Sequence, residues 1–73
     1  MTILITGGAG FLGQRLARRL LERGGAEQIV LVDQVAAPDF GDGRVRSVVA
    51  DISDPAALTS LITPDVELLL LPA

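Results

Sequence analysis

The chain lacks several side chains that enzymes commonly use: its 73 residues include no cysteine, histidine, tyrosine, tryptophan or lysine. Without cysteine, disulfides, zinc–thiolate sites and thiol catalysis are excluded. Without histidine, no serine has the imidazole base that usually activates a hydroxyl nucleophile. We therefore expect no catalytic residue and no metal site within this chain.

Long apolar runs and an excess of positive charge are also missing. No stretch reaches the ~18 apolar residues of a membrane span, and the chain opens on Ile3-Leu4-Ile5 without a basic leader. No secretory signal is expected, and cytoplasm is the default compartment. The formal net charge is −3, which argues against nucleic acid or an anionic membrane as the main partner. We interpret four arginines as a solvated helix face: Arg15, Arg18, Arg19 and Arg23.

Aromatic residues are scarce, and the only two are Phe11 and Phe40. The core must therefore consist mainly of leucine, isoleucine, valine and alanine. A chain of this size buries only about 60% of the surface it exposes when unfolded, so its own core would be marginal. Its hydrophobic content of 49% is high for so small a chain. Such a composition is typical of a segment that packs against further protein.

The apolar residues fall into short runs that predict secondary structure. Uniformly apolar runs, such as Ile29-Val30-Leu31-Val32, are typical of parallel strands buried on both faces. Between Phe11 and Arg23 the apolar residues recur with helical spacing and share one face, and Gly24-Gly25 supplies the cap that ends this helix. Asp54 and Pro55 predict the N-cap and first position of a second helix. The residues predicted on the apolar face of the first helix are Leu12, Leu16, Ala17, Leu20 and Leu21.

The order of these elements, β-α-β-β-α-β, predicts an α/β fold. Right-handed crossovers favour a parallel sheet, and we predict the strand order 3-2-1-4. The chain reverses direction across the sheet between the first and fourth strands, so their carboxyl ends form a topological switch point, where such sheets bind ligands. The strands are expected over residues 2–6, 29–32, 45–50 and 66–71, and the helices over 11–23 and from 55 to a stop at Thr63-Pro64.

A glycine-rich run joins the first strand to the first helix. Gly8-x-Gly10-x-x-Gly13 matches the dinucleotide-binding fingerprint, and so does the staggered pattern that starts at Gly7. In that fingerprint the first glycine permits a tight turn, Gly10 lets a pyrophosphate approach the backbone, and Gly13 lets the helix pack close to the sheet. The helix N-terminus then offers free N–H groups to the phosphates. Five residues are predicted to contact the cofactor here: Gly7, Gly10, Phe11, Leu12 and Gly13.

An acidic residue follows the second strand at the distance that the fingerprint requires. Asp33 comes 20 residues after Gly13 (33 − 13), where a carboxylate accepts hydrogen bonds from the adenosine ribose and repels a 2′-phosphate. NAD is therefore favoured over NADP, although Arg44 and Arg46 keep NADP open as a phosphate-pairing alternative. An FAD site usually has glutamate at this position, so aspartate favours NAD.

Asp51 closes the third strand, beside the place that the adenine would occupy in a sheet of this order. Its carboxylate could accept a hydrogen bond from the adenine amino group. Asp51, Ser53 and Asp54 could equally be ordinary cap and turn residues. The residues themselves leave both interpretations open.

With the run from Thr6 to Gly13, Asp33 and Asp51-Ile52 in place, the whole chain resembles the extended short-chain dehydrogenase/reductases, the NAD-dependent epimerase/dehydratase family. The resemblance implies that Asp51 and Ile52 contact adenine and that Leu71 lies beside the cofactor, where Pro72 removes one backbone N–H. Within the family, the segment from Gly10 to Leu16 is most similar to the sugar-acid dehydrogenases of the D-erythronate type.

The resemblance also implies that the catalytic Tyr-x-x-x-Lys of the family and its Ser/Thr partner lie downstream of this segment. Residues 1–73 are therefore expected to form the N-terminal part of a Rossmann domain that is cut after its fourth strand. We expect the chain to bind the ADP portion of NAD, with a sugar or sugar-acid substrate only in a longer parent. The alternative is a non-catalytic module that binds NAD(H) or another protein, for which the apolar strand over 66–71 offers a surface for self-association.

Overall fold

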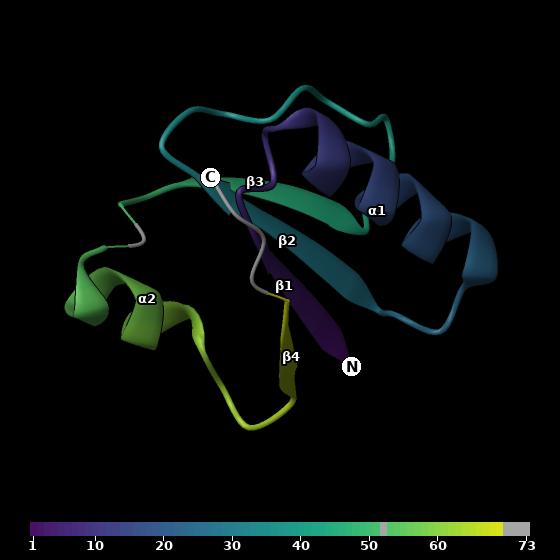
Figure 1. Cartoon of the computed structure of the whole chain (residues 1–73). Coiled ribbons are helices and arrows are strands. Elements are labelled where there is room, and N and C mark those ends of the chain that lie inside the picture. The colour runs from purple at the N-terminus through teal and green to yellow at the C-terminus, as the bar shows by residue number, and fades with distance from the viewer. Residues whose placement is uncertain (52, 70–73) are drawn as a thin grey trace.

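Four parallel strands form one sheet, in the order β3-β2-β1-β4 (Figure 1). The structure is a computed structural model that describes residues 1–51 and 53–69. Its elements are β1 (Thr2–Thr6), α1 (Phe11–Arg23), β2 (Gln28–Asp33), β3 (Val45–Val49), α2 (Pro55–Leu61) and β4 (Val66–Leu69). The predicted α/β class and the strand order 3-2-1-4 are confirmed. In the described residues no helix is long and apolar enough to cross a bilayer.

The register brings the carboxyl ends of the strands to one edge of the sheet. Thr6 of β1 lies beside Val32 of β2, and Asp33 at the end of β2 lies beside Val49 of β3. Because every pair is parallel, the segments that leave β1, β2 and β3 emerge at this common edge. The glycine run and both predicted acidic residues follow these three strands.

The two central strands carry the core because they are covered on both faces. On one face Ile5, Ile29 and Leu31 pack against Ala17 of α1. On the other face Leu4 and Val32 have Leu58 and Leu61 of α2 packed against them. This two-sided burial explains why β1 and β2 are uniformly apolar in sequence. The outer strands β3 and β4 are only partly buried.

The second helix begins as its sequence predicts. The carboxylate of Asp54 accepts a hydrogen bond from the backbone N–H of Ala56 at 3.1 Å, and Pro55 occupies the first helical position. This cap satisfies one N–H group that the first turn would otherwise leave unpaired. The helix ends at Leu61, just before the predicted stop.

The predicted apolar face of α1 is wrong at its first member. The side chain of Leu12 is 58% exposed, whereas the buried residues of the helix are Gly13 and Ala17. The reason is the close approach of the helix to the turn at Gly13, which leaves Leu12 on the outer side of the first turn. Two strands also differ from prediction: β2 extends one residue further at each end than 29–32, and β3 ends at Val49 instead of residue 50. The predicted end of the fourth strand, at residues 70 and 71, lies outside the described part of the chain.

Candidate functional site

The glycine run forms a tight turn between β1 and α1 at the carboxyl edge of the sheet. Gly7 has a φ of 68°, in the left-handed region that favours glycine. The N–H of Gly8 donates to the carbonyl of Val32 at 3.2 Å, which ties the turn to the end of β2. The N–H of Gly10 donates to the carbonyl of Gly7 at 3.2 Å and closes the turn.

Two glycines of the run are required by packing within the protein. A Cβ at Gly8 would lie 2.6 Å from the Cβ of Leu31, and a Cβ at Gly13 would lie 2.7 Å from both the Gly7 carbonyl oxygen and the Gly8 Cα. The turn thus packs closely against β2, and α1 packs closely against the turn. Gly13 therefore allows close packing on the turn itself, where the fingerprint predicted packing on the sheet. Gly8 was not among the residues predicted to contact the cofactor, although it is the first glycine of the Gly8-x-Gly10-x-x-Gly13 fingerprint.

Gly10 differs from these two glycines. Its backbone is extended, with φ −76° and ψ 169°, a conformation that any residue can adopt. Among the described residues, a Cβ built on Gly10 would meet only the Gly7 carbonyl oxygen, at an ordinary contact distance of 3.5 Å, and Gly10 is exposed. Neither the backbone conformation nor the internal packing explains a glycine here.

The first turn of α1 has no anionic partner of its own. Its N-cap is Gly10, which has no side chain to accept a hydrogen bond, and the first turn contains no acidic residue. The positive end of the helix dipole is therefore uncompensated by nearby side chains of the helix. Phe11 is 75% exposed, and its ring lies 5.4 Å from the Arg15 guanidinium carbon. Phe11 and Leu12, both exposed, follow Gly10 directly at the start of the helix.

The carboxylate of Asp33 connects the end of β2 to the glycine turn. Its Oδ2 accepts from the N–H of Ala9 at 3.1 Å, and its Oδ1 accepts from the N–H of Gln34 at 2.7 Å. Each oxygen of an ionised carboxylate can accept a second hydrogen bond. Asp33 is therefore held in a fixed orientation while it keeps acceptor capacity on both oxygens. The structure brings together the turn and the acid that the sequence predicted as partners.

The segment between β2 and β3 folds back over α1 (Figure 1). The Ser47 hydroxyl accepts from the N–H of Ala37 at 2.9 Å. The ring of Phe40 packs against the α1-side core and lies 5.3 Å from the Arg18 guanidinium carbon. These two contacts anchor the segment to β3 and to α1.

Arg44 and Arg46 lie away from the glycine turn. Arg44 precedes β3 and pairs with Asp42 at 2.7 Å, which lowers the pKa of that carboxyl to about 2. Arg46 lies beside Val30, three residues before the carboxyl end of β2. Neither arginine is therefore placed at the carboxyl edge next to Asp33, and the NADP alternative loses the phosphate partners on which it rested.

Asp51 lies close to Asp33 but is already engaged in a turn. The N–H of Ala50 donates to the Asp33 carbonyl at 2.9 Å, so the end of the third strand adjoins the end of the second. The Asp51 carboxylate accepts from the Ser53 hydroxyl at 2.6 Å and from the Ser53 N–H at 2.9 Å. These hydrogen bonds, that of the hydroxyl first, lower the pKa of Asp51. Of the remaining predicted contacts, Ile52 and Leu71 lie outside the described residues.

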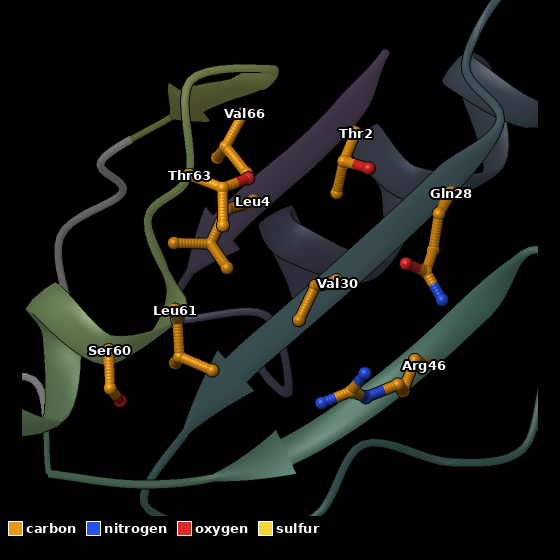
Figure 2. A pocket seen from close by; sticks show the side chains of 9 residues that line it. All are labelled: Thr2, Leu4, Gln28, Val30, Arg46, Ser60, Leu61, Thr63 and Val66. Carbon is orange, nitrogen blue, oxygen red and sulfur yellow. The ribbon is translucent and has the colours of Figure 1, made fainter.

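Two hollows of the described surface lie away from these residues. One, of about 240 Å³, opens between the α2 face of the sheet and the end of α2, and it is lined by Gln28, Arg46 and Leu61 among others (Figure 2). Another lies at the amino ends of β1 and β4, beside Gly24 and Gly25. Neither includes the glycine turn, Asp33 or Asp51. The candidate site, formed by the glycine turn and the Asp33 carboxylate, therefore lies outside both hollows.

The fold and the site together define a Rossmann-type nucleotide-binding unit: a parallel sheet, a strand–glycine turn–helix and an acidic residue at the end of the second strand. Comparison with known families agrees with this class. The model of the NAD dependent epimerase/dehydratase family matches residues 3–70, and the chain belongs to that family.

The curated relatives and solved structures that this chain resembles are longer enzymes. D-erythronate dehydrogenase of Cupriavidus necator is 47% identical over 74 aligned positions, which cover 89% of this chain and 23% of that protein. The enzyme of the same name from Haemophilus influenzae is 41% identical over 92% of this chain and 22% of its own length. This chain thus spans under a quarter of the length of these two relatives. A variant of uronate dehydrogenase from Agrobacterium tumefaciens, solved in complex with NAD, has a TM-score of 0.77 and 27% identity, with 96% of this chain and 25% of that one covered.

Proposed function

We propose that this chain binds the ADP portion of NAD across the carboxyl ends of β1, β2 and β3. The turn from Gly7 to Gly13 would hold the pyrophosphate, with the backbone N–H groups of Phe11 and Leu12 facing the phosphates. Asp33 would accept the ribose hydroxyls. The structure solved with NAD in the uronate dehydrogenase relative supports this choice of cofactor.

The observation that carries the proposal is the unexplained glycine at position 10. Gly8 and Gly13 are needed by the protein's own packing, whereas a Cβ at Gly10 would fit within the protein and would project from an exposed turn at the start of a helix. A ligand that must approach the backbone closely gives the reason for glycine there. The N-terminus of α1, whose first turn contains no acidic residue, supplies the matching charge for a pyrophosphate.

The acid at the end of β2 sets the preference between the two nicotinamide dinucleotides. The Asp33 carboxylate retains acceptor capacity for two ribose hydroxyls and would repel a 2′-phosphate. Neither Arg44 nor Arg46 is placed beside it to reverse that preference. Asp51 would lie at the adenine, whereas the predicted cofactor contacts of Ile52 and Leu71 lie outside the described residues.

Bound NAD would supply a hydride acceptor at its nicotinamide ring, and the residues of this chain would bind and orient the opposite end. The chain contains no tyrosine, lysine or histidine for acid–base chemistry. We infer that residues 1–73 are the cofactor-binding segment of a longer sugar-acid oxidoreductase, as the D-erythronate dehydrogenase relatives suggest. The intact mass of the natural protein tests this inference: a mass several-fold above 7.6 kDa is expected, and a mass equal to it favours the non-catalytic module.

Substitution of Gly10 tests the nucleotide site. Gly10→Ala should leave the thermal midpoint close to that of the wild type, because the added Cβ fits, and should weaken NAD and ADP binding by roughly tenfold or more through contact with the pyrophosphate. Isothermal titration calorimetry measures both affinities. Gly43→Ala is the matched control, since a Cβ there meets nothing within 4 Å. Unchanged NAD affinity in Gly10→Ala would contradict the proposal.

A further inference from the structure

A side chain outside the glycine run contacts it directly. The Nε2 of Gln14, in the first turns of α1, donates to the carbonyl oxygen of Ala9 at 2.7 Å. The backbone N–H of the same residue donates to the Gly10 carbonyl at 3.0 Å. Gln14 therefore binds the two carbonyls at the centre of the turn, one through its side chain and one through its backbone.

These contacts fix the peptide group between Ala9 and Gly10 at both of its polar ends. Its C=O is held by the Gln14 side chain, and its N–H donates to the Gly7 carbonyl at 3.2 Å. On the other side of Ala9, the N–H is held by Asp33 at 3.1 Å. A planar peptide held at both ends cannot rotate without the loss of two hydrogen bonds.

The need for such a restraint comes from Gly10 itself. Rotation of the Ala9–Gly10 peptide changes ψ of Ala9 and φ of Gly10, and glycine adopts φ of either sign at little cost. The residue that lets a ligand approach therefore also lets this peptide flip. A flip would exchange the positions of the N–H and the C=O, and the Ala9 carbonyl oxygen would then face the Gly7 carbonyl oxygen. That repulsion would distort the turn that receives the phosphates.

We propose that Gln14 is a positioning residue for the phosphates of the dinucleotide, because its amide holds the Ala9–Gly10 peptide in the orientation that phosphate binding needs. This role rests on the proposed function. It acts only through the pyrophosphate half of the ligand, so its loss should weaken ligands with phosphates and leave adenosine, which has none, unaffected.

The test compares Gln14→Met with wild type for three ligands: NAD, ADP and adenosine. Methionine keeps the length and helix propensity of glutamine and removes the donor without adding charge. The dissociation constants of NAD and ADP should rise roughly three- to tenfold, the effect of one neutral hydrogen bond, while that of adenosine should change less than twofold. Gln28→Met, the same substitution at the amino end of β2 (Figure 2), should change none of them.

The outcomes are distinct. Unchanged ADP affinity in Gln14→Met would overturn the positioning role and leave the nucleotide site intact. An equal loss for ADP and adenosine, with a lowered thermal midpoint, would show a purely structural role and overturn it as well. If the wild-type protein itself binds neither NAD nor ADP, the proposed function fails and the role falls with it. NMR of the free protein adds a readout without ligand: the Ala9 carbonyl and Gly10 amide shifts should move in Gln14→Met and not in Gln28→Met.

Discussion

At the scale of single residues, the glycines of one motif serve different purposes. Gly8 and Gly13 are fixed by contacts below 3 Å with the backbone and with Leu31 that any Cβ would make, so their replacement would strain the fold. Gly10 is free of such contacts. Stability and binding are therefore expected to respond to different members of the same run, which a sequence pattern alone cannot separate.

Asp33 gives the prediction that belongs to this scale. Asp33→Asn should weaken NAD binding by about tenfold or more, since a charge-assisted hydrogen bond contributes about 1.5–3 kcal/mol, and should reduce the preference for NAD over NADP because the repulsion of the 2′-phosphate is lost. Fluorescence or calorimetric titration with both dinucleotides measures this. The control is Asp39→Asn, in the loop that follows, where the carboxylate accepts only from the N–H of Gly41. A preference ratio equal to that of the wild type would exclude Asp33 from ribose recognition.

At the scale of elements, the sequence predicted what depends on local chemistry. The cap at Asp54 with Pro55, the uniformly apolar β1 and β2, and the strand order were all correct, because capping, two-sided burial and crossover handedness are local or general rules. The exposure of Leu12 and the bond from Gln14 to Ala9 were not predictable. Both depend on the distance between α1 and the glycine turn. The close contacts of Gly13 with Gly7 and Gly8 set that distance.

The loop from β2 to β3 illustrates the same limit. Pro38, Gly41 and Gly43 are residues typical of a loop. The anchoring of Phe40 against Arg18 and of Ala37 by Ser47 depends instead on tertiary contacts. The loop leaves β2 directly after Asp33, so its anchoring also fixes the backbone beside the proposed ribose site.

Removal of the Phe40 ring tests this anchoring. Phe40→Ala should lower the free energy of unfolding by about 1–2 kcal/mol, less than a fully buried ring would cost because Phe40 is only half-buried. Hydrogen exchange at the Ala37 amide should become faster as the loop detaches. Val35→Ala, at an exposed position in the same loop, should do neither. Unchanged exchange at Ala37 in Phe40→Ala would show that the ring does not hold the loop.

At the scale of the whole molecule, the described residues form one half of a nucleotide-binding architecture. The ends of β1, β2 and β3 provide a surface for an adenosine diphosphate, while β4 pairs only with β1 in the described part of the chain. Self-association along the strand that begins at Val66 stays a prediction, which light scattering can test. The nicotinamide half of the cofactor would need protein beyond these elements, so we expect ADP to compete with NAD almost as well as NAD itself binds.

The central claim, that this edge of the sheet binds the ADP portion of NAD, is tested most directly by NMR titration of the ¹⁵N-labelled protein with ADP. The predicted result is a set of saturable amide shift changes confined to the turn from Gly7 to Gly13, to Asp33 and its neighbours, and to Asp51. NAD should produce nearly the same pattern. Absence of saturable changes, or changes centred on Thr2, Gln28 and Arg46 at the hollow of Figure 2, would contradict the account.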